Sequence, residues 1–494
     1  MSATANKVFK SSAFLLLAKF IQRTIGLISI LVLARVLTPD DFSVVAISAL
    51  LLYFCETLAA TGSESYIIHK DDVDPTDLST AWSIDLIIKS LIFLILVLAI
   101  PFIADFYDDQ RLVPVLYATS SILLINAMKS PGLIVLKREL DYRRIFYVMI
   151  TQKVCAFTVT LSIALTTESY WALIVGDITS AGVLCLGSYL IHKFRPWPCL
   201  ANWRNQWRFS KWILFRASVG FSKSQMDSLL ISKFFSAQEL GAFYMTKNLS
   251  VLPSTDIIGP AVEPLLASLS RVRNNLQEFN QQLSKAIFVI TTILMPLVVF
   301  MWFFPEHIIN FFFGQDWQIA YVMLPPLAIV LATIAFGQVI NQAVMSLGRV
   351  RALFIYEIIG LITLASALFL GRNLDIGHFL EIRALLAIIL IAGIISYLKM
   401  TTGIRIIRLA ALITPTVVLA TGAAWVTGLL EKAWGIEVSG LSVFPLAMLY
   451  FALLIPCFLA LLFAFYRRSA EGAFALKMLR MAMSVVRERL ARNG

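Results

Sequence analysis

The chain has 494 residues, of which 59% are hydrophobic and only 14% are charged, and its formal net charge is +11. Soluble proteins contain about 45–50% hydrophobic and about 25% charged residues, so this composition excludes an ordinary soluble protein. The basic residues are concentrated in segments between apolar runs. Their distribution therefore indicates membrane topology, and we expect no nucleic-acid partner.

The hydrophobic residues form continuous apolar runs of about 18 residues or more, the length at which a helix crosses a bilayer. Because the runs are continuous rather than alternating, they exclude a transmembrane β-barrel. We therefore predict an all-α polytopic membrane protein with about fourteen transmembrane helices. The predicted helices cover residues 12–36, 43–62, 82–104, 112–133, 145–166, 170–191, 212–235, 241–262, 284–304, 318–346, 350–370, 378–399, 405–429 and 441–465.

The first predicted helix carries two basic side chains, Lys19 and Arg23, within a run that must cross lipid. An ionised side chain in the bilayer core costs at least about 2.5–3.5 kcal/mol, so such a residue faces protein or water and often marks a transport pathway. Lys19, Arg23 and Gly26 follow one another at i, i+4 and i+7, so they share one helical face. This face lines a cavity, or Lys19 instead reaches back to the inner membrane surface.

The seventh predicted helix repeats this arrangement with Arg216, Lys223 and Asp227. Residues 34–43, after the first helix, align with residues 232–241 at an offset of 198 residues. A duplicated bundle with a polar face in each half is typical of transporters. Two such faces opposed across a pseudo-two-fold axis would form a positive, water-filled cavity, where arginine binds phosphate with paired hydrogen bonds. Alternatively, Lys223 and Asp227 only neutralise each other.

Four further carboxylates lie within predicted helices, namely Glu56, Asp85, Asp177 and Glu357. By the same cost argument, each is either a site that couples a proton or sodium ion to transport or a partner in a structural ion pair. Asp85 precedes Lys89 by four residues, so this pair is the first candidate for a structural role. Prolines at positions 260, 296, 325 and 326 would act as hinges for alternating access or as static kinks.

The sequence also predicts how the chain is divided. A polar stretch rich in Trp and Arg follows the sixth helix, and its prolines indicate a cytoplasmic link between bundles. Residues 265–283 have apolar side chains at helical spacing and predict an amphipathic helix on the cytoplasmic surface. The predicted domains are an N-terminal six-helix bundle over 1–191, the link over 192–211, a C-terminal six-helix bundle over 212–400, two additional transmembrane helices over 401–465, and a basic amphipathic cytoplasmic tail over 466–494.

The connecting segments decide orientation and disfavour enzymes. Lys and Arg gather in residues 137–144, 193–211 and 467–494, so the positive-inside rule places both termini in the cytoplasm. The segments on the other side are short, whereas a polymerase or glycosyltransferase needs a sizeable catalytic loop. Asp40 and Asp41 superficially resemble the acidic pair of such enzymes. However, they follow a Thr-Pro pair, and this sequence is typical of a turn. No phosphate-binding loop and no cysteine or histidine pattern predicts a metal or cofactor.

Three stretches carry a resemblance to a known family. Residues Gln225–Tyr244 resemble the seventh-helix signature of Wzx-type polysaccharide flippases, and Leu37–Phe42 and Pro264–Ser270 fit the same family. The resemblance covers most of residues 10–400 and is strongest to colanic-acid and amylovoran exporters. It implies the fold of the multidrug/oligosaccharidyl-lipid/polysaccharide (MOP) superfamily and movement of undecaprenyl-diphosphate-linked oligosaccharide. The resemblance also implies a location in the bacterial inner membrane, where the protein contacts membrane lipids. The polymerase and chain-length-control proteins of the same pathway are candidate protein partners.

These observations favour a flippase that works by alternating access and supplies exopolysaccharide or lipopolysaccharide synthesis. The diphosphate of the lipid-linked substrate would bind Lys19, Arg23, Arg216 and Lys223. The first alternative is an ion-coupled exporter of drugs or organic cations on the same fold, which should have an acidic or aromatic cavity, whereas cations outnumber carboxylates in the first and seventh helices. The second is a membrane-embedded polymerase, which the short outer segments disfavour.

Overall fold

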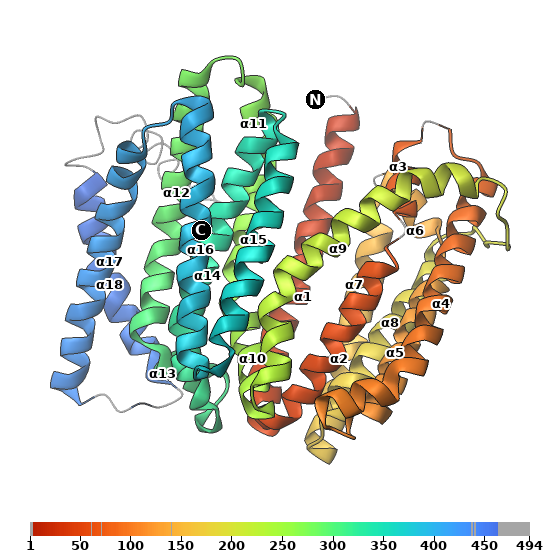
Figure 1. The fold of residues 1–494 in the computed structure, drawn as a ribbon, viewed down its shortest axis with the longest axis horizontal. Helices are drawn as coiled ribbons and strands as arrows, with labels where there is room; N and C mark the ends of the chain where they lie inside the picture. The colour runs from red at the N-terminus through yellow and green to blue at the C-terminus, as the bar shows by residue number, and fades with distance from the viewer. Residues whose placement is uncertain are drawn as a thin grey trace, which may run out of the picture. The chain divides into compact units, whose positions relative to one another are not determined.

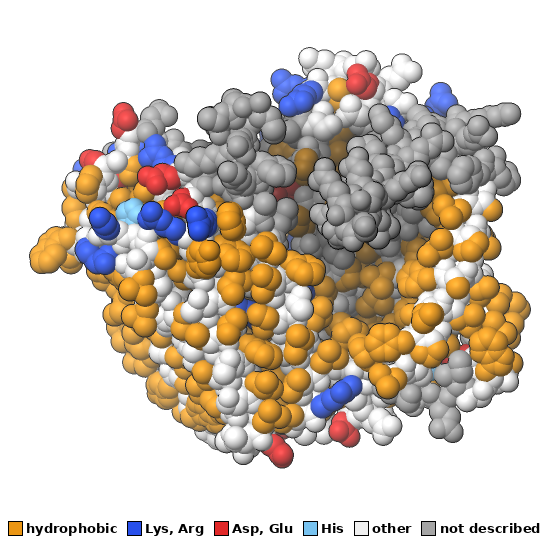
Figure 2. All heavy atoms as spheres, turned by 180° about the vertical axis from the view of Figure 1, so that it is seen from behind, with side chains coloured by type: hydrophobic (Ala, Val, Ile, Leu, Met, Phe, Trp, Pro, Cys, Tyr) orange, Lys and Arg blue, Asp and Glu red, His pale blue; other side chains and the backbone are white. Residues whose placement is uncertain are grey.

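The computed structural model describes residues 3–462, apart from residues 61, 71, 140, 436, 437, 439 and 440. All regular secondary structure in that part of the chain is helical, as predicted (Figure 1). The predicted tail over 466–494 lies outside the described residues. Figure 2 shows hydrophobic side chains over the middle of one face and charged side chains near its upper and lower edges, as expected for a protein that crosses a bilayer.

The chain forms two compact units that divide inside one helix, after Tyr244. The first unit contains α1 (Ala3–Val36), α2 (Pro39–Leu58), α3 (Ser63–His69), α4 (Pro75–Tyr107), α5 (Leu112–Ala127), α6 (Gly132–Arg138), α7 (Tyr142–Thr167), α8 (Trp171–Ile191) and α9 (Trp203–Phe234). Helix α7 packs against α1 and α8, α5 packs against α2, α4 and α8, and α9 packs against α2 and α4. Ile100 of α4 and Leu112 and Leu123 of α5 are fully buried.

The second unit begins within α10. The helices from there on are α10 (Ala237–Pro253), the π-helix η1 (Ser254–Ile258), α11 (Gly259–Arg271), α12 (Leu276–Phe303), α13 (Pro305–Phe312), the 3-10 helix η2 (Gln315–Trp317), α14 (Ile319–Ser346), α15 (Val350–Leu370), the 3-10 helix η3 (Gly371–Asn373), α16 (Ile376–Thr402), α17 (Ile406–Trp434) and α18 (Val443–Leu461). Helix α12 packs against α14 and α17, and α14 also packs against α11 and α16. The buried hydroxyl of Tyr450 in α18 donates to the carbonyl of Pro296 in α12 at 2.9 Å.

The predicted spans are all occupied by helices. Among the described residues, eleven helices are long and apolar enough to cross a membrane, and α5 with α6, bent by 60°, makes a twelfth. The other two predicted spans, 212–235 and 241–262, fall on α9 and on α10 with η1, where charged and polar side chains interrupt the apolar run. The predicted number of fourteen transmembrane helices is therefore close to the twelve candidates that helix length and composition support. These two criteria do not confirm the other two helices.

The two turns that align in the sequence also share their local structure. At the start of α2, the Thr38 hydroxyl accepts a hydrogen bond from the Asp41 N–H (3.3 Å), and the Asp41 carboxylate accepts one from the Thr38 N–H (3.0 Å). At the start of α10, Ser236 and Glu239 form the same reciprocal pair at 3.3 and 2.8 Å. Each residue of the second capping box lies 198 positions after its counterpart, which supports the predicted duplication.

The two turns also contact each other within the first unit. A Cβ atom added at Gly241 would lie only 1.7 Å from the carbonyl oxygen of Pro39 and 3.1 Å from the backbone nitrogen of Ser43. Glycine is required there because only glycine permits such a close backbone approach. Ser43 is the position that aligns with Gly241, so the two copies meet at corresponding positions.

One local prediction was wrong. Residues 265–283 do not form a single amphipathic helix, because α11 ends at Arg271 and α12 begins at Leu276. The Asn275 side chain accepts a hydrogen bond from the Glu278 N–H at 3.3 Å and so caps the new helix. Asparagine is favoured at the N-terminal cap of a helix and disfavoured in its interior. This local preference divides the predicted amphipathic helix into two.

The segment between α8 and α9 packs on the start of α4. The Asp77 side chain is fully buried and accepts hydrogen bonds from the Lys70 ammonium (2.5 Å) and the Asn202 amide (2.8 Å). Gln206 donates to the carbonyl of Asp77 at 3.0 Å. These contacts, with those of α9 to α2 and α4, explain why the compact units divide after Tyr244 and not in the link over 192–211. The division of the chain into two six-helix bundles, inferred from the sequence repeat, remains a prediction.

Candidate functional site

Three helices of the first unit bring charged side chains together within the spans. Lys153 of α7 interacts electrostatically with Asp177 of α8 and with Arg23 of α1. Beside them, the Gln22 amide of α1 donates to the carbonyl of Met149 in α7 at 3.1 Å. We call Arg23, Lys153 and Asp177 the Lys153 cluster. Arg23 and Asp177 were predicted as site residues, and the fold places them on helices that flank α7.

The side chains of the Lys153 cluster are only partly covered by the surrounding helices. Asp177 is exposed although it lies within the span of α8, and Lys153 and Arg23 are half-buried. On the α1 side, a Cβ atom at Gly26 would lie 3.9 Å from the Lys153 nitrogen, so the ammonium reaches the α1 surface. An ionised carboxylate and ammonium are costly in lipid, so we expect this cluster to line a hydrated region between the helices.

Close packing of α7 and α8 holds the cluster in place. A Cβ atom at Gly176 would lie 1.9 Å from the Thr160 hydroxyl oxygen, so the two helices approach as closely as a glycine permits. Near this contact, the Gln152 amide donates to the Ser180 hydroxyl at 2.7 Å. Gln152 adjoins Lys153 in the sequence, so this hydrogen bond helps to orient that part of α7.

A second group of intramembrane charges lies among α2, α4 and α5. The Asn126 amide donates to the Glu56 carboxylate at 2.7 Å. Lys129, just beyond α5, is attracted by Glu56 and Asp85 and repelled by Lys89. All five side chains are half-buried. Cations and carboxylates are equal in number here, so this group has the composition of a structural network.

The cationic face predicted on the seventh span lies on α9. Phe221 of α9 meets Tyr53 of α2 edge to face with ring centroids 5.2 Å apart, within the contact between these two helices. Asp227 is buried, with 2% of its surface exposed, and Lys223 is half-buried. Arg216 belongs to the part of α9 whose side chains are not described. The convergence of the first- and seventh-span cations in one cavity therefore remains a prediction.

The structure also describes two further predicted site residues, Lys19 and Glu357. Lys19 is exposed on α1, one turn before Arg23. Glu357 is half-buried in α15 of the second unit. Its proposed role in ion coupling remains a prediction, as do those of the other carboxylates. Among the described residues there is no group of three or more His, Cys, Asp or Glu arranged to hold a metal ion.

The sequence analysis missed a π-helix in the eighth span. The five residues of η1 separate α10 from α11, and Asp256 within it is exposed. The Gln338 amide of α14 donates to the Ser254 hydroxyl at 3.4 Å. Single π-turns are frequent at functional sites because they turn side chains away from the regular helical register. The available signal was a polar triplet between Pro253 and Pro260 in an apolar run.

The second unit also contains an apolar pocket of about 400 Å³ between α12, α14, α16 and α17. Its walls include Ile287, Met295, Phe336, Ile391 and Leu409. The volume lies within the range of small-molecule sites, and the lining suits an alkyl or polyprenyl chain.

Charged clusters inside a bundle of membrane spans define the class of the protein as a membrane transporter. A sequence profile for the family described as "Polysaccharide biosynthesis protein" matches residues 32–322, which is more than half of the chain. The chain therefore belongs to that family.

Individual relatives agree with this assignment. The lipopolysaccharide biosynthesis protein WzxC of Escherichia coli (strain K12) is 19% identical over 358 residues, covering 71% of this chain and 72% of WzxC. The succinoglycan biosynthesis transport protein ExoT of Rhizobium meliloti (strain 1021) is 22% identical over 312 residues, covering 62% of this chain and 63% of ExoT.

Solved structures show the same fold. The lipid II flippase MurJ, in an inward closed conformation, superposes with a TM-score of 0.68 at 13% identity, covering 89% of this chain and 97% of MurJ. An inward-facing multidrug resistance MATE transporter of the MOP superfamily has a TM-score of 0.58 at 13% identity, covering 79% of this chain and 95% of the transporter. The expected fold, shared with MurJ and this MATE transporter, is thus confirmed.

Proposed function

We propose that the protein is a flippase that moves undecaprenyl-diphosphate-linked oligosaccharide units from the cytoplasmic to the outer leaflet of a bacterial inner membrane. It would act by alternating access and supply exopolysaccharide or lipopolysaccharide synthesis. The family, the relatives named for lipopolysaccharide biosynthesis and succinoglycan transport, and the fold shared with a lipid II flippase support this proposal. The observation that carries it is the Lys153 cluster, in which two cations and one carboxylate interact within the spans and would line a hydrated path.

The substrate has two chemically distinct parts, and the protein has a region suited to each. The diphosphate would bind Arg23 together with Lys19, Arg216 and Lys223, with Lys153 adding a further positive charge. Arginine suits this role because its planar guanidinium donates paired hydrogen bonds to phosphate oxygens. The apolar pocket between α12, α14, α16 and α17 would accept part of the polyprenyl chain.

The carboxylates would divide between ion coupling and structure. Asp177 is the strongest candidate for coupling, because it is an incompletely covered carboxylate within a span and interacts with Lys153. Asp227 and Glu357 are further candidates. Glu56 and Asp85 would be structural, because Asn126 hydrogen-bonds the first and Lys129 attracts both.

Charge at the two ends of the second unit supports cytoplasmic termini. The connections at one end carry Arg271, Arg273, Arg349, Arg351, Arg405 and Arg408. Those at the other end are mainly acidic, with Glu306, Asp316, Asp375 and Glu431 beside Arg372 and Lys432. By the positive-inside rule the arginine-rich end is cytoplasmic. We treat the protein as a transporter and not an enzyme, and the polymerase and chain-length-control proteins of the pathway as its candidate partners.

Sealed proteoliposomes test the proposal. Lipid-linked oligosaccharide carrying a fluorophore on the sugar should become accessible to an external quencher only when the protein is present. The MATE neighbour supports a second candidate, an exporter of organic cations. Uptake of a fluorescent organic cation, without movement of the lipid-linked oligosaccharide, would favour that candidate and contradict the flippase.

A further inference from the structure

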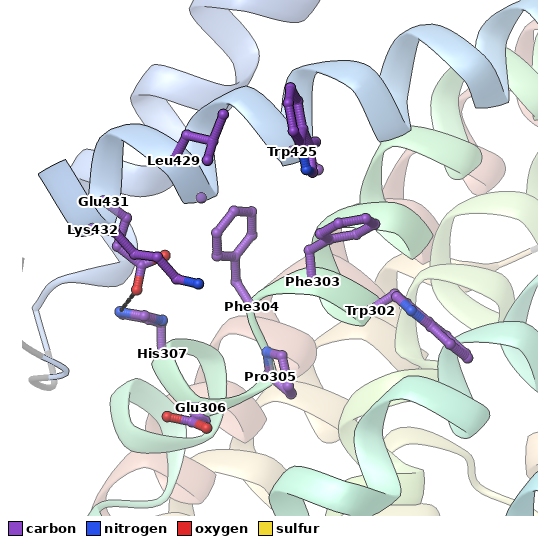
Figure 3. Close-up of a pocket in the computed structure, with 12 residues that line it drawn as sticks. Trp302, Phe303, Phe304, Pro305, Glu306, His307, Trp425, Leu429, Glu431 and Lys432 are labelled. Atoms are coloured by element: carbon purple, nitrogen blue, oxygen red, sulfur yellow. Dashed lines mark ion pairs between the residues drawn. The ribbon is translucent and has the colours of Figure 1, made fainter.

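A second pocket, of about 460 Å³, lies at the acidic end of the second unit (Figure 3). It is formed where α12 passes into α13 and by the last turns of α17. Its aromatic walls are Trp302, Phe303 and Phe304 on one side and Trp425 on the other. Glu306, His307, Glu431 and Lys432 supply its polar groups. The volume is ample for a small ligand.

The centre of the polar side is an imidazole whose hydrogen-bonding capacity is not satisfied. The His307 side chain is 4% exposed, and its Nε2 lies 3.4 Å from the Glu431 carboxylate without the geometry of a hydrogen bond. Burial lowers the pKa of His307, against the opposing effects of Glu431 and Glu306, and so favours the uncharged imidazole. The Nε2 atom is itself buried, so the imidazole forms part of the pocket wall, and the more accessible Glu431 and Lys432 side chains are the polar groups that a ligand would meet.

We infer that this pocket binds a sugar ring of the transported oligosaccharide once it reaches the outer side, an inference that rests on the proposed function. A pyranose has a face of C–H groups that packs on an aromatic ring and a rim of hydroxyls that both donate and accept hydrogen bonds. Trp425 and Phe304 provide aromatic faces, and Phe304 lies between Trp425 and the polar groups (Figure 3). Glu431 accepts hydroxyl hydrogens and Lys432 donates to hydroxyl oxygens.

The membrane interface alone does not account for this arrangement. Aromatic residues gather at helix ends because they favour the lipid–water boundary, which explains an exposed residue such as Trp434. It does not explain why the His307 side chain is buried against Glu431 at the edge of an aromatic-lined pocket. The pocket lies at the outer end in the orientation proposed above, so a saccharide released there would meet it at high local concentration.

The test uses full-length protein in phosphatidylcholine nanodiscs and calorimetric titration with the water-soluble oligosaccharide released by mild acid from the host's lipid-linked oligosaccharide. The wild type should bind it, and Trp425→Ala should weaken binding at least tenfold. Glu431→Gln should weaken binding several-fold. The matched control is Trp434→Ala, on the same helix end but outside the pocket lining, which should change affinity less than twofold. Because Trp425 is 62% and Trp434 64% exposed, both variants should keep the thermal stability of the wild type.

Three results would overturn the inference. They are no binding by the wild type, an equal loss in Trp425→Ala and Trp434→Ala, and loss of saccharide binding when phosphatidylethanolamine replaces phosphatidylcholine, which would assign the pocket to a lipid headgroup. Flipping by the wild type is measured separately. Flipping without saccharide binding leaves the proposed function intact and removes this inference. Pocket-dependent binding without flipping supports the inference and removes the proposed function.

Discussion

Single charged residues inside the membrane carry most of the functional argument, because each must be compensated by protein or water. The sequence identified Arg23 and Asp177 as such residues from their position in apolar runs. It did not identify Lys153 as the residue that links them. That link depends on α7 packing against both α1 and α8, and hydropathy along the chain contains no information about which helices are neighbours.

Arg23 offers the most direct test at this scale. Arg23→Ala should reduce the initial flipping rate in proteoliposomes at least tenfold, because it removes a cation from the Lys153 cluster. Arg23→Lys should restore part of the rate, because the charge returns without the paired hydrogen bonds to phosphate. Lys193→Ala is the control, since Lys193 is exposed outside the spans, and it should leave the rate unchanged. If Arg23→Ala flips at the wild-type rate, Arg23 has only a structural role.

At the scale of the helices, the sequence predicted where helices lie along the chain better than it predicted where they are interrupted. Long apolar runs locate helices such as α4 and α12 because burial in lipid requires every backbone group to be bonded within the helix. The end of α11 at Arg271 and the π-helix η1 depend instead on local capping and on polar partners across the bundle. The repeated turn was predictable because its capping residues recur at one fixed offset.

The contact between the two repeated turns is testable at Gly241. Gly241→Ala should lower the melting temperature by several degrees, because its Cβ would overlap the Pro39 carbonyl and force α10 away from α2. Gly393→Ala in α16 is the matched control, since a Cβ there meets nothing within 4 Å. It should leave stability unchanged or raise it slightly. Thermal unfolding of the purified variants provides the comparison, and equal melting temperatures would show that the first unit tolerates separation of the turns.

For the whole molecule, orientation follows from charge and can be checked directly. Alkaline-phosphatase fusions after Asp41, Asp109 and Asp316 should be active, because these positions lie in the connections that the positive-inside rule places outside. Fusions after Arg144 and Arg208 should be inactive. An active fusion after Arg208 would place the link between α8 and α9 outside and contradict cytoplasmic termini.

Energy supply is the last property of the whole molecule that the proposal must explain. The sequence has no phosphate-binding loop, so transport would draw on the membrane potential, an ion gradient or consumption of the product. The substrate diphosphate is anionic, and a negative-inside potential favours its outward movement by about 2.3 kcal/mol per charge per 100 mV. In proteoliposomes with a potassium gradient, valinomycin should therefore accelerate flipping when it makes the starting compartment negative and slow it when the gradient is reversed. Asp177→Asn should retain this response but lose any acceleration by an imposed proton or sodium gradient, if Asp177 couples the ion. Fast, substrate-specific flipping that ignores both potential and ion gradients would contradict coupling and would leave downstream polymerisation as the driving force.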